Sequence, residues 1–467
     1  MILALLLACD NGADSDPGGV SDALQVRILA PVTGDLTDEC ADVCFTIEVS
    51  ENGSPATGAE VDVELRDWGF AFFDMLTRDD GLATYCTYGI PAGTHEFVAV
   101  ATHEKLPGEV FTAEGSLTVA PFGYAMGFDR STEVIEEIPY VPKFQDYSGN
   151  PVLPPTGDEA DFDAVGTILP TVATDGTGYF MWYAGQQILG EDYLIGAAAS
   201  DDGFAWERLG LGEPGVPSGI EGDWKNLSTN SPFLMLDDEE WRLYYTGRRE
   251  EEGNLSIGLA TSTQYELDHG SAGSAYKLAD LLPIERGGEN PVLDHIDAEE
   301  LWGGDAVAHP SVLKNPQGFY EMWYSTGRHR VGYALSPDGL DWTHYCNNPV
   351  LLGESEAGNW ELGRVKSTEV AMLDDYYVMA YTGGDTGYFQ VGWAMSLDGI
   401  HWTKAENPVL AVDAESTWKN QSTIGASLMV DEARGVLRTW YSGTYTGGGN
   451  AGSAVGYAEA ELPTSLP

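Results

Sequence analysis

The sequence predicts an all-β protein of two domains, a β-sandwich followed by a five-bladed β-propeller that is closed by a strand from its N-terminal side. Three observations predict this fold. Short apolar runs bounded by Gly, Pro, Asn and Asp follow one another along the chain, which is typical of strands joined by tight turns. From residue 162 onward one pattern recurs five times, and its last copy is one strand short. With 467 residues and 43% hydrophobic content, the chain can bury two separate cores.

The repeated unit consists of a leading aromatic residue, an apolar strand, an aromatic-rich strand, a third strand, a tight turn and a closing segment. In residues 302–351 the turn is Ser336-Pro337-Asp338-Gly339, followed by Trp342. One four-stranded unit cannot bury both of its faces, so the copies are expected to pack in a ring. The predicted blades lie near residues 162–213, 224–293, 302–351, 360–410 and 418–460, and their leading aromatics are Phe162, Trp224, Trp302, Trp360 and Trp418.

The closing segment of each unit reads NPVL in the clearest copies, at residues 290, 348 and 407, and it is interpreted as the fourth strand. The fifth copy stops after its third strand at Ala460. A further NPVL at residues 150–153 precedes the first copy and is expected to supply the missing strand. The propeller would then span residues 121–463.

Residues 23–120 contain six runs with period-two alternation, which predicts a β-sandwich. Alternation places Phe45 and Ile47 inward and Cys44 outward, so a bond from Cys44 to Cys86 between the two sheets is doubtful, and the pairing among Cys40, Cys44 and Cys86 stays open. The segments NGSPATGAEVDVEL and DDGLATY resemble those of bacterial immunoglobulin-like domains. The resemblance implies an immunoglobulin-like β-sandwich that acts as a spacer.

Residues 1–9, MILALLLAC, are apolar and end at Cys9, and residues 10–22 are rich in Gly, Asp, Ser and Pro. The first segment resembles the signal of bacterial lipoproteins, whose lipobox cysteine is lipidated, although it lacks a basic region. The second segment reads as a flexible tether. The resemblance implies a protein that is exported and lipid-anchored to the bacterial cell envelope, facing the periplasm or the cell exterior.

The charge balance limits the partners of the protein. Twenty-two Lys and Arg stand against 74 Asp and Glu, a formal net charge of -52, which excludes nucleic acid as a partner and restricts membrane contact to the lipid anchor. A monomer without a cofactor is expected. A structural calcium ion would suit so acidic a chain, but no segment matches a known calcium-binding loop.

The fivefold combination of MWYSG, S-x-D-G-x-x-W and NPVL resembles the propellers of the arabinanase, levansucrase and invertase superfamily, which includes glycoside hydrolase families 43, 32, 62, 68 and 130. The resemblance implies a carbohydrate bound over the central funnel and acidic side chains from successive blades as general base, modulator and general acid. Family 43 has Asp before the Pro of the first two inner strands. This chain has Leu169 and Ser231 there, so the usual triad is not matched.

The catalytic candidates are therefore other acids near the inner strands: Asp163, Asp305 and Glu369. For Asp163 and Asp305 the favoured alternative is a turn or cap carboxylate on the rim. Glu369 occupies a strand position where other blades have Pro or Ala, and a carboxylate there needs a partner, for which Arg364 and Lys366 are candidates. The candidate substrate-binding residues are Lys225, Asn226, His309, Arg364, Lys366, Lys419, Asn420 and Gln421.

Two functions remain open on the sequence alone. A cell-surface glycoside hydrolase requires two funnel carboxylates, one to protonate the leaving oxygen and one to activate water or attack. A non-catalytic glycan-binding or adhesion propeller requires only amides, aromatics and cations there. The lysines Lys225, Lys366 and Lys419 stand at equivalent blade entries and favour an anionic group on the ligand, unless neighbouring carboxylates pair with them.

Overall fold

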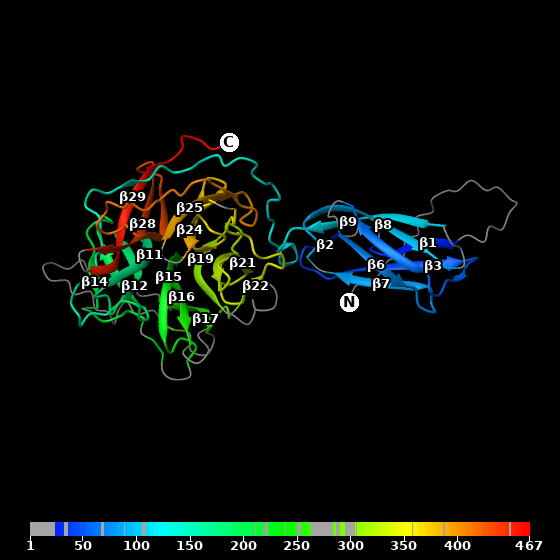
Figure 1. Ribbon diagram of the computed structural model, residues 1–467, viewed down its shortest axis with the longest axis horizontal. Helices are drawn as coiled ribbons and strands as arrows, with labels where there is room; N and C mark the ends of the chain where they lie inside the picture. The colour runs from blue at the N-terminus through cyan, green and yellow to red at the C-terminus, as the bar shows by residue number, and fades with distance from the viewer. Residues whose placement is uncertain are drawn as a thin grey trace. The chain divides into compact units, whose positions relative to one another are not determined.

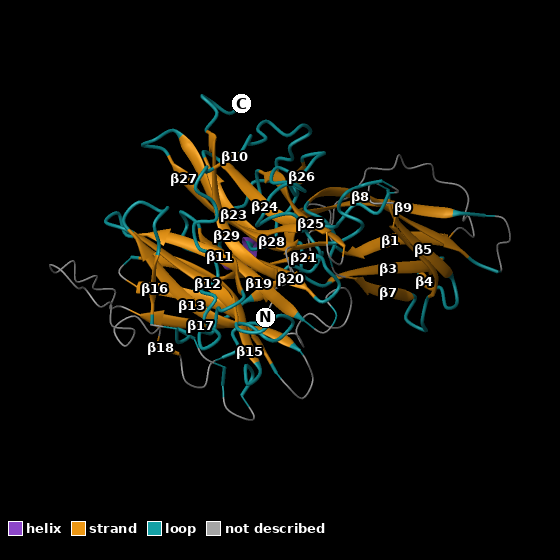
Figure 2. Cartoon of the chain, turned by 60° about the vertical axis from the view of Figure 1, so that its left-hand side comes forward, coloured by secondary structure: helices purple, strands orange, loops and turns teal. Residues whose placement is uncertain are grey.

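The computed structural model divides the chain into two compact units, Met1–Ala120 and Pro121–Pro467 (Figure 1). The residues described are 24–31, 36–66, 70–87, 89–104, 109–210, 212–216, 218–219, 223–238, 240–249, 254–262, 284–285, 290–294, 304, 306–356, 358–385, 388–447 and 450–467. Cys9, the tether, Trp302 and Asp305 lie outside them. Within these ranges the only helix is the 3-10 turn Tyr124–Met126, and no helix is long and apolar enough to cross a membrane (Figure 2).

Unit 1 is a sandwich of two sheets. One sheet contains β1 (Leu24–Ala30), β3 (Val43–Glu51), β4 (Ser54–Pro55) and β7 (Leu82–Thr87), and the other β2 (Leu36–Asp38), β5 (Glu60–Leu65), β6 (Phe70–Leu76), β8 (Gly93–Thr102) and β9 (Phe111–Ala120). Alternate residues of β3 and β5 fill the space between the sheets, among them Phe45, Ile47 and Val63, all fully buried. The predicted inward face of β3 is confirmed, whereas β6 was not predicted.

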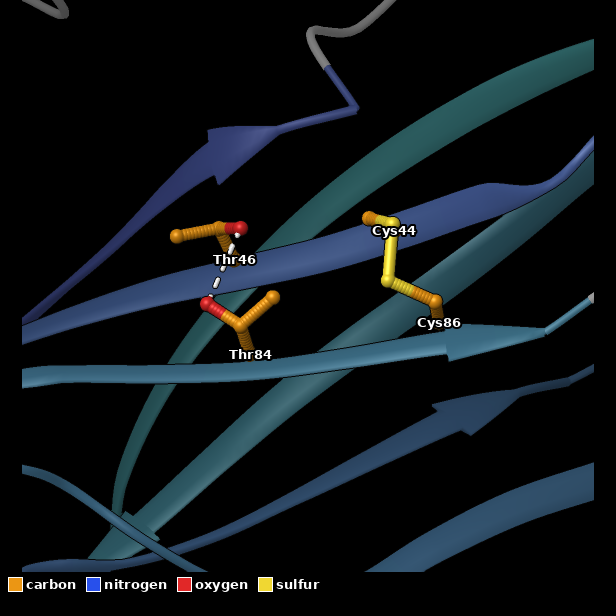
Figure 3. The surroundings of a disulfide bond; sticks show 4 residues. All are labelled: Cys44, Thr46, Thr84 and Cys86. Atoms are coloured by element: carbon orange, nitrogen blue, oxygen red, sulfur yellow. Dashed lines mark hydrogen bonds between the residues drawn. A yellow bond between two sulfur atoms is a disulfide. The ribbon is translucent and has the colours of Figure 1, made fainter.

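A disulfide joins Cys44 of β3 to Cys86 of β7, with an S–S distance of 2.03 Å (Figure 3). The two cysteines are direct partners in neighbouring antiparallel strands of one sheet, on its exposed face. On the same face, the hydroxyls of Thr46 and Thr84 lie 3.3 Å apart. Both cysteines point outward, as alternation requires, so the bond links strands within one sheet rather than the two sheets.

Replacing both Cys44 and Cys86 by serine should destabilise unit 1 by about 2–4 kcal/mol, because the bond closes a long loop in the unfolded chain. The two residues are 42 positions apart. Faster hydrogen exchange in β3 and β7 would report the loss. Thr84→Val changes the same face without touching the cross-link and should leave exchange nearly unaltered. Equal exchange in the serine variant and the native protein would contradict the prediction.

Unit 2 is a propeller of five four-stranded antiparallel blades, of which blades 1 and 5 are joined into one eight-stranded sheet by a parallel bridge between Gly166 and Ser453. The strands of each blade are given from the inner to the outer one. Blades 1 and 2 consist of β11 (Gly166–Thr174), β12 (Tyr179–Gln186), β13 (Leu194–Ser200) and β14 (Glu207–Leu209), and of β15 (Ser228–Asp237), β16 (Glu240–Arg248), β17 (Leu255–Ser262) and β18 (Ile284–Glu285). Blades 3 and 4 consist of β19 (Val307–Lys314), β20 (Tyr320–Thr326), β21 (Val331–Ser336) and β22 (Thr343–His344), and of β23 (Val365–Leu373), β24 (Tyr376–Asp385), β25 (Tyr388–Ser396) and β26 (Thr403–Lys404). Blade 5 consists of β27 (Ser422–Asp431), β28 (Val436–Gly447), β29 (Asn450–Glu461) and β10 (Gln145–Asp146).

The NPVL segments are not the fourth strands, contrary to the sequence interpretation. The fourth strand follows the S-x-D-G-x-x-W turn in blades 1, 3 and 4, and β10 takes its place in blade 5. In NPVL the asparagine side chain bonds both backbone groups of one third-strand residue, as Asn348 does with Tyr333 at 2.8 and 2.9 Å. The leucine adds a single bridge, such as Leu153 to Val455. An amide side chain thus replaces a strand. The ring is still closed from the N-terminal side.

The four leading aromatic residues that the structure describes are wedges inside the blades. Phe162 stacks on Tyr183 with ring centroids 5.9 Å apart. A Cβ at Gly185 or Gly196 would come within 2.3 or 2.1 Å of its ring, so these glycines make room for it. Three other blades repeat the arrangement with Trp224, Trp360 and Trp418.

Residues 121–144 form a strap that crosses blades 3 to 5 before β10 begins. The side chain of Gln317 in blade 3 bonds the backbone of Asp129. In blade 4, the indole of Trp393 donates to the carbonyl of Tyr140 at 2.9 Å. The Tyr140 hydroxyl then donates to the carbonyl of Glu461 in blade 5 at 2.8 Å. The strap therefore ties three blades together.

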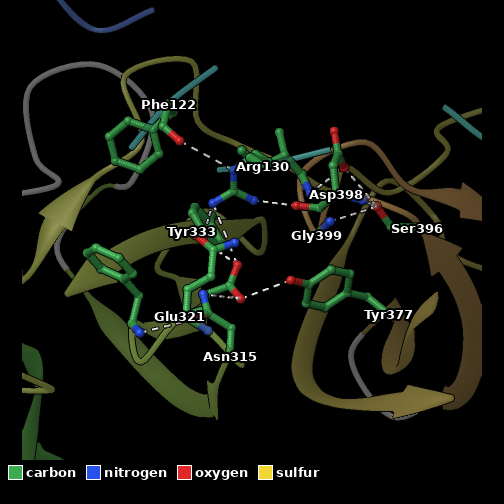
Figure 4. Close-up of polar contacts among 12 residues, drawn as sticks. Phe122, Arg130, Asn315, Glu321, Tyr333, Tyr377, Ser396, Asp398 and Gly399 are labelled. Carbon is green, nitrogen blue, oxygen red and sulfur yellow. Dashed lines mark hydrogen bonds and ion pairs between the residues drawn. The ribbon is translucent and has the colours of Figure 1, made fainter. Parts of the chain in front are cut away.

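The strap also delivers Arg130 into the interior between blades 3 and 4 (Figure 4). Its guanidinium donates to the Tyr333 hydroxyl and to the Asp398 carbonyl, and lies 3.6 Å from the Glu321 carboxylate. Glu321 is fully buried and also accepts hydrogen bonds from Tyr333 at 2.7 Å and Tyr377 at 2.9 Å. The arginine is the cationic partner that allows this carboxylate to be buried.

Candidate functional site

All five inner strands have a β-bulge at the same place, and each bulge contains a residue with positive φ. These residues are Leu169, Ser231, His309, Ser367 and Gly425. Because every blade contributes one, they converge on the axis of the ring and line a pocket. Its free volume is about 30 Å³, which is room for one group of the size of a water molecule. We call this pocket the funnel floor.

The bulges change the alignment of Glu369. The sequence aligned it with the prolines of the other inner strands, but the positive φ at Ser367 places Thr368 at that position. Glu369 is one residue further along and lines the floor. Its Oε1 accepts a hydrogen bond from Ser427 Oγ in blade 5 at 3.2 Å. The partner of the carboxyl group is therefore Ser427, not Arg364 or Lys366.

The environment of the floor keeps both of its ionisable side chains neutral at pH 7. Burial raises the pKa of Glu369 to about 8, against the opposing effect of the hydrogen bonds from Ser427 and Leu428. Burial lowers the pKa of His309 to about 3, and the nearby charges of Lys366 and His329 lower it further. The floor thus offers a protonated carboxylic acid beside an uncharged imidazole.

Three polar atoms of the floor are buried and have no hydrogen-bond partner within the described chain: His309 Nδ1, Ser367 Oγ and Thr368 Oγ1. Such atoms are rare in folded proteins, and each costs about 1–3 kcal/mol when it is left unsatisfied. The three residues belong to two neighbouring blades and line one pocket. The arrangement can satisfy a ligand that both donates and accepts hydrogen bonds.

Asp163 does not reach the funnel floor. It is fully buried within blade 1, where it accepts hydrogen bonds from Tyr183 Oη at 2.9 Å and Arg208 Nε at 2.7 Å. Equivalent ion pairs join Glu361 to Lys404 in blade 4 at 2.7 Å and Lys419 to Asp146 in blade 5. Each links the residue after the leading aromatic to the outer strand of its own blade. Asp163 and Lys419 are therefore paired within their own blades and do not line the funnel floor.

The other predicted binding residues are divided between the floor and the blades. Lys225 is buried, with its ammonium 5.8 Å from the ring of Tyr245. The amide of Asn420 bonds the backbone of Thr446 in blade 5. These two, together with Asn226 and Gln421, do not line the floor. His309 does, and Lys366 and Arg364 precede the bulge of β23.

Sequence reasoning missed Ser367, Thr368 and Ser427 as floor residues. Ser and Thr are common in strands, so their presence in an inner strand does not mark them as site residues. Ser367 is distinguished only by its position in the bulge, which corresponds to that of His309. A wider hollow of about 550 Å³ opens between the ends of the strands of blades 1 and 2, lined among others by Gln186, Tyr193 and Asn230. Asn230 also accepts a hydrogen bond from Ser231 of the floor at 2.8 Å, so the linings of the two cavities are in contact.

Among the described residues no group of three or more His, Cys, Asp or Glu side chains is placed to hold a metal ion. The calcium ion considered from the composition therefore gains no side-chain site there.

No protein-family model matches the sequence, and no curated protein matches it. Many solved structures share the fold. A structure described as a complex of BT0996 with RGII aligns with a TM-score of 0.53 at 19% identity, over 70% of this chain and 94% of its own. A protein described under the GH130 family of mannoside phosphorylases, in connection with hydrolases of β-1,2 mannosidic linkages in Candida mannan, aligns with a TM-score of 0.52 at 16% identity, over 71% and 97%. The β-1,2-mannobiose phosphorylase from Listeria innocua aligns with a TM-score of 0.50 at 12% identity, over 68% and 97%. The propeller of this chain thus has the fold of glycoside hydrolases and glycoside phosphorylases.

Proposed function

We propose that this protein binds a carbohydrate in the central funnel of its propeller. The observation that carries the proposal is the set of three buried, unsatisfied polar atoms, on His309, Ser367 and Thr368, around one axial opening. Sugar hydroxyls donate and accept hydrogen bonds at once, and one hydroxyl is about the size that the floor admits. The ring itself would lie above the floor, toward the hollow near Asn230. The shared fold with glycan-active enzymes supports this ligand class.

We further propose that the protein is exported and anchored to the bacterial envelope through Cys9, with unit 1 as an immunoglobulin-like spacer. The Cys44–Cys86 bond supports export, because disulfides persist in oxidising compartments. Membrane fractionation of a Cys9→Ala variant tests the anchor, and a variant that stays in the membrane fraction would contradict it.

The Thr368→Val variant should separate binding from folding. Valine keeps the shape of threonine but removes a hydroxyl that has no partner among the described residues, so stability should stay equal or rise. Affinity for the glycan should fall about 2–10-fold, the net worth of one hydrogen bond. A glycan array identifies the ligand, and calorimetry and thermal unfolding then give the two readouts.

Thr229→Val is the matched control for this experiment. Thr229 is also buried in an inner strand, but its hydroxyl donates to the Val216 carbonyl at 2.9 Å. This variant should lose stability and keep its affinity. If Thr368→Val instead loses stability and binds the glycan normally, the floor is not the binding site.

Glycosidic cleavage is a second candidate function, favoured by the protonation state of Glu369. A general acid must hold its proton at the working pH, and the raised pKa of Glu369 meets this requirement. The second carboxylate that hydrolysis needs is not among the described floor residues, and Asp305 lies outside them. A screen of chromogenic glycosides should then show turnover that Glu369→Gln abolishes while glycan binding survives. Unchanged turnover in that variant would remove Glu369 as the acid.

A further inference from the structure

Lys366 differs in its partners from four other interior cations of the propeller. Arg130, Arg208, Lys404 and Lys419 each form an ion pair with a carboxylate. The ammonium of Lys366 has no carboxylate or hydrogen-bond partner in the described part of the chain and instead lies 4.0 Å from the centre of the Phe389 ring. In a chain with 74 acidic residues, an interior lysine without an acidic partner is unexpected.

The position of Lys366 connects it to the funnel. It immediately precedes the bulge residue Ser367, and its register in β23 corresponds to that of Asn230 in β15, which lines the larger hollow. Its charge is close enough to His309 to lower the pKa of that imidazole. Lys366 is therefore next to the floor along β23, at the register position that lines a hollow in blade 2, and we call its surroundings the funnel wall.

Several titratable groups lie close to Lys366. Arg364 is two residues away and lowers the pKa of Lys366, after the larger effect of burial, to about 8. Glu369 is protonated and His309 is neutral at pH 7. His329 is near enough to act on His309 as well. The aromatic face of Phe389 offsets only part of the cost of burying an ammonium group.

We infer that the funnel wall at Lys366 binds an oxyanion carried by the ligand, a uronate carboxylate, a sulfate ester or a phosphate. This inference rests on the proposed carbohydrate function and narrows it to acidic glycans. An oxyanion would supply the counter-charge that the protein does not, through a charge-assisted hydrogen bond. The acidic protein surface repels anionic ligands over long range, and about 0.15 M salt screens this repulsion. The preference for acidic over neutral glycans therefore depends on direct contact with the funnel wall.

The experiment compares anions on the full chain and on two variants, Lys366→Met and Lys143→Met. The probes are inorganic phosphate, inorganic sulfate, and methyl galacturonoside beside its neutral methyl ester. Lys143 is exposed near the outer edge of blade 5, so its replacement removes the same charge far from the funnel. At pH 7, at least one anion should bind the native protein and Lys143→Met alike, and Lys366→Met about 10–100-fold more weakly.

The pattern of binding identifies the source of the oxyanion. Preference for the galacturonoside over its ester indicates an acidic sugar, and binding of the inorganic ions alone indicates a free anion. In either case, raising the pH from 7 to 9 should weaken binding, because Lys366 loses its proton and Glu369 gains a charge. In the Glu369→Gln variant, the pH dependence of anion binding should come from Lys366 alone.

Two results overturn the inference. One is that no anion binds more tightly to the native protein than to Lys366→Met, and the other is that Lys143→Met loses as much affinity. The same experiment tests the proposed carbohydrate binding separately from the anion site. If neutral glycans bind without regard to Lys366, carbohydrate binding stands and the anion site falls. If no glycan binds, but an inorganic anion binds the native protein and not Lys366→Met, the anion site is supported and carbohydrate binding is not.

Discussion

Replacing Arg130 by methionine should lower the free energy of unfolding of the propeller by about 3–5 kcal/mol. The methionine would fill a similar space but leave the Glu321 carboxylate fully buried without a cation. It would also remove the donors to the Tyr333 hydroxyl and the Asp398 carbonyl, which join the strap to blades 3 and 4. Urea unfolding followed by tryptophan fluorescence measures the change, because four blade tryptophans are almost fully buried.

Two controls separate the buried charge from the loss of an arginine as such. Arg434 forms an exposed pair with Glu459 at 3.1 Å, and Arg434→Met should cost less than about 1 kcal/mol. Adding Glu321→Gln to Arg130→Met removes the unpaired charge and should restore part of the loss. If Arg130→Met costs no more than Arg434→Met, the strap does not depend on its arginine.

Glu369→Gln should make the protein more stable than the native form at pH 8 and leave the two nearly equal at pH 4. The pKa of Glu369 is about 8 in the folded protein, above its ordinary value of 4.5. Below that ordinary value both folded and unfolded chains are protonated at this site. Between pH 4.5 and 8 only the unfolded chain ionises, so native stability falls relative to the glutamine variant, by roughly 3–5 kcal/mol in all. Above pH 8 the difference stays constant.

Urea unfolding of both proteins at pH 4, 6 and 8 gives this difference directly. All other titrating groups are common to the two chains and cancel. Glu406→Gln, at an exposed turn, removes the same charge and should track the native protein at each pH. A Glu369→Gln variant whose advantage does not grow with pH would show that the carboxyl is ionised and solvated in the folded state.

Most of the propeller could be predicted from its sequence, because its features repeat at corresponding positions. The aromatic second strands, the Asp-Gly turns and closure from the N-terminal side all follow from comparison among the copies. NPVL was misread because an asparagine side chain can imitate the backbone of a strand, as Asn348 does, and its letters do not reveal which hydrogen bonds it makes. Arg130 could not be predicted, since its contacts with Tyr333 and Asp398 span 203 and 268 residues.

The candidate site was harder to predict, because charge alone does not say where a side chain points. Asp163 and Lys419 occupy equivalent positions with opposite signs, and their outer-strand partners, Arg208 and Asp146, have reversed signs as well. The sequence already shows that the signs of both partners are exchanged between the two blades, and this exchange indicates that each ion pair forms within its own blade. His309 and Glu369 were found because each interrupts an inner strand. The unsatisfied hydroxyls of Ser367 and Thr368 depend on backbone geometry that only the structure provides.

The closure of blade 5 also fixes the order of events in biosynthesis. Asn150 bonds Tyr457 across 307 residues, and β29 is the only described strand that pairs with β10. During synthesis the segment around β10 emerges long before the strand that receives it, and the ring cannot be completed until nearly the whole chain is available. Such non-local pairing folds slowly and leaves the edge of β29 exposed until late. A nascent chain would therefore remain vulnerable to proteases and to strand exchange with a second copy until its own N-terminal segment docks.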